Sequence, residues 1–172
     1  MQAKSAGLAH KPCGPSLFVS HASKDQRVAW EFVREMRRGG VESWFAPRDL
    51  TAGKRYGDEI VAAIDCCDAF LLIFSEYCNQ SPWVPREIAL ADDAGKTIIV
   101  VRIDNAPAKG VLKLYLANLQ QIDARGKRDK AIREVLRGLN RDRACASPCD
   151  SRSKCASSTP PLESSSGCRC TA

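Results

Sequence analysis

The sequence lacks the long apolar segments that mark membrane-spanning and exported proteins. Its longest uninterrupted apolar run, residues 69–74, is far shorter than the about 20 residues that a helix needs to cross a bilayer. The first fifteen residues contain no apolar stretch of signal-peptide length, and Arg169 stands where a prenylation box has its cysteine. We therefore expect a cytoplasmic protein that makes no membrane contact and keeps its thiols reduced.

Histidine is scarce, and two common catalytic patterns are missing. The sequence has only two histidines, His10 and His21, so nothing indicates a Ser-His-Asp triad. No GxGxxG fingerprint of a dinucleotide cofactor is present. Of the nine cysteines, five lie in residues 141–172, but their spacing fits no zinc pattern and no histidine follows them. We expect no metal site and no bound cofactor.

The positive charge is not concentrated in the part of the chain that can fold. The net charge is +6, but residues 1–15 and 141–172 each carry a surplus of two positive charges, which leaves a surplus of two for residues 16–140. Nucleic-acid-binding domains more often present a concentrated basic face. We therefore expect no nucleic-acid partner.

Strand and helix patterns alternate along residues 16–140, which we interpret as one domain. A capping box at Ser23 predicts the start of the first helix, and Gly39-Gly40 predicts its end. Expected strands cover residues 16–20, 41–45, 69–74, 97–103 and 119–122, and further helices cover 56–64, 82–94, 111–117 and 131–139. This order predicts an α/β fold, a flavodoxin-like three-layer sandwich with a five-stranded parallel sheet.

The two ends of the chain have a different composition from the middle. Residues 1–15 are interpreted as a flexible leader. Residues 141–172 contain eight Ser and five Cys but no Val, Ile, Phe, Tyr or Trp. Such a segment cannot bury enough apolar surface to offset the entropy of ordering the chain, so we predict a disordered Cys/Ser-rich tail.

Trp83 and Glu87 are the residues that most directly indicate chemistry. On a helix, residues four apart lie on one face, so an indole would stand beside a carboxylate near the carboxyl edge of the sheet. That pair suits a flat heterocycle joined to a sugar cation. Pro85 leaves two helix starts open: from Pro82 the pair is stacked, whereas from Pro85 Trp83 lies in the loop. From the pattern alone, a glutamate favoured by the helix dipole and a packing tryptophan are also good explanations.

Several segments in the expected order resemble the Toll/interleukin-1 receptor (TIR) domain, of the bacterial kind. Residues 17–25 (LFVSHASKD) are similar to the first box of that family, and residues 44–50 (WFAPRDL) to its second box. Residues 70–75 (FLLIFS) resemble the third strand, and residues 81–87 (SPWVPRE) the segment that carries the catalytic glutamate of NAD⁺-cleaving members. The resemblance covers about residues 16–140.

The resemblance implies one of two functions, in signalling or immune defence. Some members cleave or cyclise NAD⁺, with Glu87 matching the catalytic glutamate and Trp83 the aromatic residue one turn before it. His21 and Ser23 match the nucleotide-pocket loop, and Arg48 and Asp49 match the loop that must open for NAD⁺, here a substrate and not a cofactor. Other members act only as adaptors through contacts with other TIR domains, and family pockets are often completed by a neighbouring copy.

Simpler explanations of the same residues stay open beside the resemblance. Ser23 is well explained as a helix cap, and His21 as a hydrogen-bonding loop residue. Arg48 and Asp49 suit a surface ion pair that contributes little to stability. Trp44 is expected in the core. A third function, that of a nucleoside 2-deoxyribosyltransferase, is also consistent with this fold and a single glutamate.

Overall fold

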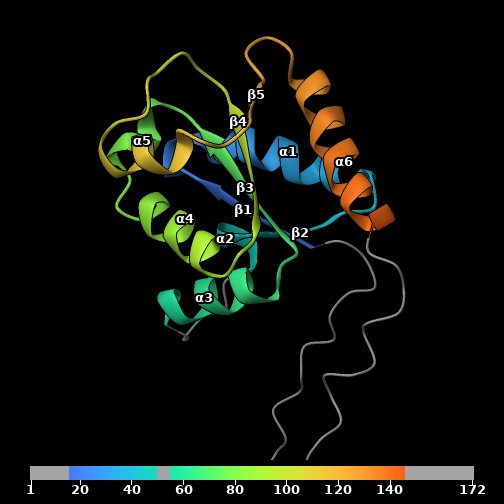
Figure 1. Cartoon of the computed structure of the whole chain (residues 1–172), viewed down its shortest axis with the longest axis horizontal. Coiled ribbons are helices and arrows are strands. Elements are labelled where there is room, and N and C mark those ends of the chain that lie inside the picture. Colours follow the sequence, from blue (N-terminus) through green and yellow to red (C-terminus); the bar gives the residue numbers. More distant parts are fainter. Residues whose placement is uncertain (1–15, 50–54, 146–172) are drawn as a thin grey trace, which may run out of the picture.

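Five parallel strands form the centre of the molecule. In the computed structural model, which describes residues 16–49 and 55–145, they lie in the order β2-β1-β3-β4-β5 (Figure 1). The strands are β1 (Ser16–His21), β2 (Glu42–Phe45), β3 (Ala69–Phe74), β4 (Thr97–Arg102) and β5 (Gln121–Asp123). The chain passes from β1 outward to β2 and then returns to β3 on the other side of β1. This is the flavodoxin-like order, so the predicted fold class is confirmed.

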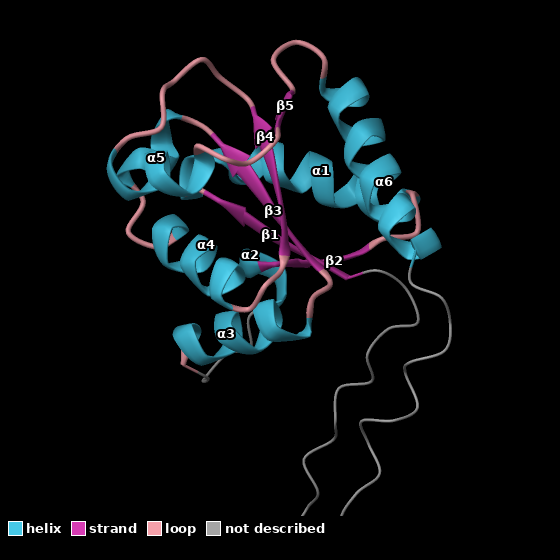
Figure 2. Ribbon diagram, viewed as in Figure 1, coloured by secondary structure: helices cyan, strands magenta, loops and turns pink. Residues whose placement is uncertain are grey.

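Helices cover both faces of the sheet (Figure 2). One face packs against α1 (Gln26–Arg38) and α6 (Arg128–Cys145). The other packs against α3 (Tyr56–Cys66), α4 (Val84–Asp93) and α5 (Gly110–Leu116). Three shorter elements, η1 (Ser23–Asp25), α2 (Ala46–Asp49) and η2 (Glu76–Gln80), follow the carboxyl ends of β1, β2 and β3.

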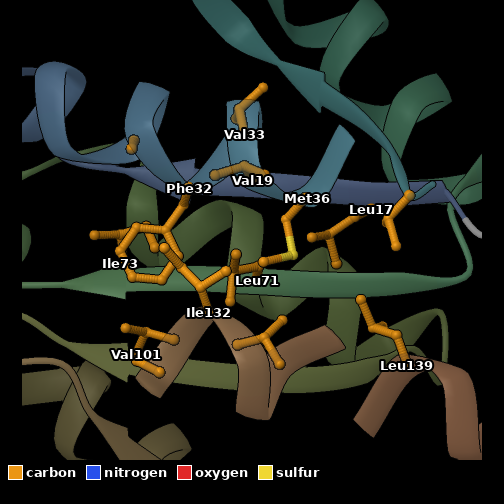
Figure 3. Packing of buried hydrophobic residues seen from close by; sticks show 14 of the residues in the cluster. Leu17, Val19, Phe32, Val33, Met36, Leu71, Ile73, Val101, Ile132 and Leu139 are labelled. Carbon is orange, nitrogen blue, oxygen red and sulfur yellow. The ribbon is translucent and has the colours of Figure 1, made fainter. Parts of the chain in front are cut away.

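The apolar alternation of the strands divides the core into two clusters. On β1, Leu17 and Val19 face α1 and α6, whereas Phe18 faces α3 and α4. Every residue of β3 is buried, as expected for a central strand covered on both sides. Figure 3 shows the first cluster, where Phe32 and Met36 of α1 lie close to side chains of β3. Each such buried side chain contributes about 1.5–3 kcal/mol to folding.

The start of the first helix differs from the prediction. Helix α1 begins at Gln26, after the short turn η1, and neither element has a side-chain cap hydrogen bond. The capping box expected at Ser23 was therefore wrong. The physical reason is tertiary: the Asp25 carboxylate, in the N-cap position of α1, accepts a hydrogen bond from the Ser75 hydroxyl beyond β3.

The end of α1 follows the prediction at Gly39-Gly40. Gly40 has a φ of 79°, which side chains other than glycine rarely adopt. Gly39 lies where α1 approaches α6, and a Cβ there would stand 2.6 Å from a methyl carbon of Leu136. Gly40 thus provides the backbone turn, and a side chain at position 39 would require the end of the Leu136 side chain to move.

Three further element boundaries differ between the prediction and the structure. The helix expected from Pro82 begins at Val84, and the polar loop after β3 is largely the 3₁₀ helix η2. Helix α6 continues to Cys145, so residues 141–145, predicted to be disordered, are helical. The predicted leader 1–15 and the remainder of the predicted tail, 146–172, lie outside the described residues. Within the described ranges no helix is long and apolar enough to cross a membrane.

Candidate functional site

Glu87 lies in the first turn of α4 with its carboxylate turned into the protein. The residue is only 5% exposed. Its Oε2 atom accepts a hydrogen bond from the hydroxyl of Ser20 on β1, with an oxygen–oxygen distance of 2.6 Å. A surface carboxylate at a helix start would be solvated, so the plain helix-dipole explanation of Glu87 does not describe its position.

The start of α4 fixes the relation between Trp83 and Glu87. The Ser81 hydroxyl accepts hydrogen bonds from the backbone N–H groups of Trp83 and Val84, both at 3.3 Å. Pro85 then occupies the second helical position, where no N–H is needed. The N–H of Glu87 donates to the Trp83 carbonyl at 2.9 Å. The helix thus starts between the two expected positions, and the four-residue spacing is that of a helical turn.

A small cavity of about 90 Å³ opens in front of this turn. It lies at the carboxyl ends of β1 and β2, where parallel sheets of this kind bind ligands. The described residues that line it are Val19, His21, Ser23, Gln26, Ala46, Ser81, Trp83 and Glu87.

Four of the six predicted site residues line this cavity: Glu87, Trp83, His21 and Ser23. Asp49 is not among its described walls, and its carboxylate accepts a hydrogen bond from the Phe45 N–H at 2.7 Å. Arg48 lies in α2, but its side chain is outside what the structure describes. Residues 50–54 of the predicted entry loop are likewise outside the described part of the chain.

The two titratable walls of the cavity have opposite pKa shifts. Burial raises the pKa of Glu87, while the Ser20 hydrogen bond works against this rise by stabilising the charged form. Burial lowers the pKa of His21, with a smaller opposing effect of a backbone hydrogen bond. The imidazole, stacked on Phe45 with ring centroids 4.9 Å apart, is therefore neutral at pH 7. Among the described walls of the cavity, Glu87 is the only carboxylic acid and His21 the only other group with a shifted pKa.

The positively charged side chain of Arg86 lies over the ring of Trp83. Its side chain is 39% exposed, and the Arg86 guanidinium carbon lies 5.3 Å from the ring centroid, a cation–π arrangement. Among the described residues, no carboxylate forms an ion pair with Arg86. The cavity wall thus combines a buried acid with an exposed indole, and the Arg86 guanidinium lies against that indole. Trp44, expected in the core, stacks on Phe18 at 4.8 Å.

Ser20, Gln26 and Ser81 were not predicted as site residues. Gln26 and Ser81 line the cavity, and Ser20 holds the carboxylate from behind. The sequence does give one indication of Ser20, because it is a polar residue that directly follows the apolar run Leu17-Phe18-Val19 of the first strand. A buried hydroxyl needs a partner, but nothing in the sequence shows that the partner is 67 residues away.

A second buried carboxylate and a larger cavity each lack the combination of buried acid and open volume found at Glu87. A second buried carboxylate, Asp25, is hydrogen-bonded to Ser75 and is not among the described cavity walls. A larger cavity of about 360 Å³ lies beside the amino end of β4, with Glu134 and Arg137 of α6 at its rim. It lies away from the carboxyl edge, and its walls hold no buried acid. The described residues contain no group of three or more side chains suited to a metal ion.

The family of the chain follows from its sequence. Residues 17–136 match the sequence profile described as the TIR domain, so this protein belongs to the TIR domain family. A search of curated proteins by sequence found no match.

Solved structures show the same fold at low sequence identity. The TIR domain of the Toll-related receptor TRR-2 from Hydra magnipapillata is 20% identical, with a TM-score of 0.60 over 73% of this chain and 95% of that one. The TIR domains of the activated Roq1 resistosome are 17% identical, with a TM-score of 0.63 over 73% and 99%. BcmB, a CMP N-glycosidase of Clostridium botulinum, is 17% identical, with a TM-score of 0.52 over 70% and 97%.

Proposed function

We propose that this TIR domain is an NAD⁺ glycohydrolase that cleaves the bond between nicotinamide and ribose, with Glu87 as its catalytic residue. The observation that carries the proposal is the position of Glu87, a buried carboxylate in the wall of a cavity beside an exposed indole. His21 and Ser23 are proposed to bind the nucleotide from the loop after β1. Arg48 and Asp49 remain candidates for the entry side, on the residue-by-residue resemblance alone.

The chemistry needs little more than this carboxylate. The nicotinamide nitrogen already carries a positive charge, so the ring can leave with the bonding electron pair without being protonated. Positive charge then develops on the ribose, and a nearby carboxylate stabilises it, as in glycoside hydrolysis. Attack of water on the ribose gives ADP-ribose, whereas attack of the substrate's own adenine gives a cyclic product.

The lowered pKa of His21 favours NAD⁺ over substrates with a neutral base. Release of a neutral base such as cytosine is helped by a group that protonates it. Burial disfavours the protonated form of His21, so among the described walls this residue is a poor donor for such a base. NAD⁺ needs no such donor, which makes it better suited to this site than a deoxynucleoside or CMP, the substrate named for the BcmB structure.

The size and charge of the site suggest how a dinucleotide would lie. Binding sites for whole organic ligands usually enclose about 300–1,000 Å³, so a cavity of about 90 Å³ suits only one ring or sugar. The nicotinamide would stack on the Trp83 indole where this ring lines the cavity. The pyrophosphate would then lie outside the cavity, where the Arg86 guanidinium can bind phosphate oxygens.

The test is nicotinamide release from NAD⁺ by the purified protein, free in solution and clustered on vesicles through an affinity tag. We expect release that Glu87→Gln reduces about a thousandfold, the size of effect seen when a charge-stabilising group is removed. Asp25→Asn is the matched control, since it neutralises a second buried carboxyl and should leave release within about threefold of wild type. Equal release by wild type and Glu87→Gln, or none from clustered wild type, would exclude the enzymatic function.

A second candidate is a non-catalytic adaptor that acts by contact with other TIR domains. The observation in its favour is the outer face of α5, where Val111 is 57% and Leu114 76% exposed. These two side chains lie one helical turn apart, and apolar side chains that gather on one face can take part in protein–protein contact. If this function is the main one, Leu114→Asp should weaken self-association measured by analytical ultracentrifugation. Glu87→Gln should then leave partner binding unchanged.

A further inference from the structure

Ser20 occupies a position in the sheet where an apolar residue is expected. It lies on β1 beside Leu72 of β3 and is 1% exposed. Strand alternation puts its side chain on the same face as Phe18, which belongs to the cluster covered by α3, α4 and α5. A hydroxyl in such surroundings is unfavourable unless it is hydrogen-bonded, and its partner here is the Glu87 carboxylate.

We propose that Ser20 is the positioning residue for Glu87, holding Oε2 from behind so that Oε1 is presented to the cavity, and favouring the charged form of the carboxylate through this hydrogen bond. This inference rests on the proposed function for its catalytic consequence. The hydrogen bond itself joins two different elements, a central strand and the helix that crosses it, and therefore fixes the carboxylate relative to the sheet.

The electrostatic part of the role follows from burial. Taking a carboxylate out of water favours its protonated form, which cannot stabilise a ribosyl cation. The hydroxyl donates its proton to the charged oxygen, and such hydrogen bonds to charged groups contribute about 1.5–3 kcal/mol. The other cavity walls offer no substitute: His21 is neutral, and the remaining described walls carry no charge.

Ser20 does not itself reach a substrate. It is not among the described walls of the cavity, and the carboxylate of Glu87 lies in front of its hydroxyl. A nucleophilic serine activated by a neighbouring base needs access to the reacting atom. The geometry therefore gives Ser20 an indirect role, exerted through the position and charge of Glu87.

The experiment compares Ser20→Ala with Ser20→Thr, which retains the hydroxyl, and Ser20→Cys, which offers a weaker donor of similar size. Ser43→Ala is the control, because Ser43 is a buried serine on the neighbouring strand β2 that is not among the described cavity walls. The titration of Glu87 is followed by carbon-13 NMR with labelled glutamate, assigned by its loss in Glu87→Gln. The pH dependence of kcat for NAD⁺ cleavage is measured on the same proteins.

In Ser20→Ala we expect Glu87 to titrate at higher pH than in wild type. Catalysis needs the ionised form, so the acid limb of the kcat profile should move to higher pH. At neutral pH kcat should fall about tenfold, from loss of a hydrogen bond to a charged group, with KM unchanged. Ser20→Cys should lie between Ser20→Ala and wild type, Ser20→Thr should recover most of the loss, and Ser43→Ala should titrate and react like wild type.

The two measurements separate this inference from the proposed function. An unchanged Glu87 titration in folded Ser20→Ala overturns the inference, whether or not NAD⁺ is cleaved. If Ser20→Ala does not fold, an unchanged titration in Ser20→Cys has the same meaning. If the Glu87 titration shifts in Ser20→Ala but wild type does not cleave NAD⁺, the role of Ser20 in positioning Glu87 is supported. In that case only the proposed enzymatic function is contradicted.

Discussion

Two pairs of a serine and a buried carboxylate lie at the carboxyl edge of the sheet, and they differ in access. Ser20 donates to Glu87, and Ser75 donates to Asp25. Both carboxylates are almost fully buried, and burial is the main cause of the raised pKa of each. Glu87 is among the described walls of the cavity of about 90 Å³ and Asp25 is not, whereas the Ser75 hydroxyl also accepts a hydrogen bond from the Tyr77 N–H at 3.1 Å. We call them the open pair (Ser20–Glu87) and the sealed pair (Ser75–Asp25).

The comparison shows that a perturbed carboxylate is not enough to locate a site. Structural networks shift pKa values as active sites do, and by burial and hydrogen bonding alone the two pairs are alike. What separates them is an open volume next to the carboxylate, together with an aromatic side chain that faces it. We therefore expect the open pair to affect activity and the sealed pair to affect stability.

The largest effect on stability is expected from breaking the sealed pair. In Asp25→Ala the Ser75 hydroxyl loses its acceptor in the interior, and we expect a loss of about 2 kcal/mol in the free energy of unfolding. Urea unfolding at neutral pH measures this loss. Nicotinamide release per folded molecule should stay close to wild type, and a loss of release as large as that in Glu87→Gln would contradict the structural assignment of this pair.

The next effect concerns Trp83, the aromatic residue that lines the cavity together with Glu87. Trp83→Ala should raise KM for NAD⁺ about tenfold, because stacking and cation–π attraction to a charged ring contribute about 0.5–2 kcal/mol. Trp83→Phe keeps an aromatic face and should recover part of the loss. The measurement is initial-rate kinetics with nicotinamide detection, and an unchanged KM in folded Trp83→Ala would show that the indole is only a packing residue.

Glu87→Gln should stabilise the fold while it removes activity. The folded-state pKa of Glu87 is raised above its unfolded value, so the ionised carboxylate destabilises the fold at neutral pH and the protonated one does not. Removing the charge should raise the free energy of unfolding by on the order of 1 kcal/mol at pH 7. The gain should shrink as the pH falls towards the unfolded pKa of about 4.3. Urea unfolding of both proteins at pH 7 and near this lower pH measures the gain, and equal gains at the two pH values would contradict its electrostatic origin.

The smallest effect is expected at Arg86, which lies against the Trp83 ring. Arg86→Gln should raise KM for NAD⁺ about threefold, the size of a solvent-exposed charge interaction. Nicotinamide riboside, which carries the same leaving group but no phosphate, is the matched substrate and should show no change. A similar increase for both substrates would mean that Arg86 acts by supporting Trp83 and not by binding phosphate.

Local patterns in the sequence predict much of the fold and the outline of the site. The buried run of β3 and the alternating strands and helices give the layers and the strand order. The four-residue spacing of Trp83 and Glu87 gives the helical turn that carries the candidate chemistry. These features depend on neighbours in the sequence, where backbone periodicity determines which residues share a face.

The rest depends on contacts between distant residues. The Ser20–Glu87 bond joins residues 67 positions apart, and the start of α1 was missed because Asp25 bonds to Ser75, 50 positions away. The site itself was found through the family resemblance, since a glutamate in a first turn is common at protein surfaces. Burial and a cavity, which distinguish Glu87 from such residues, exist only after the chain has folded.

The crosswise layout of the two pairs has a consequence for how the domain can diverge. The segment of β1 and its following turn supplies Ser20 and Asp25, while the segment after β3 supplies Ser75 and Glu87. The Glu87 carboxylate is thereby anchored to β1 through Ser20, a residue outside the β2–α3 connection. A chimera that replaces residues 46–55 with those of another TIR domain should alter substrate preference while the inherited acid keeps its place.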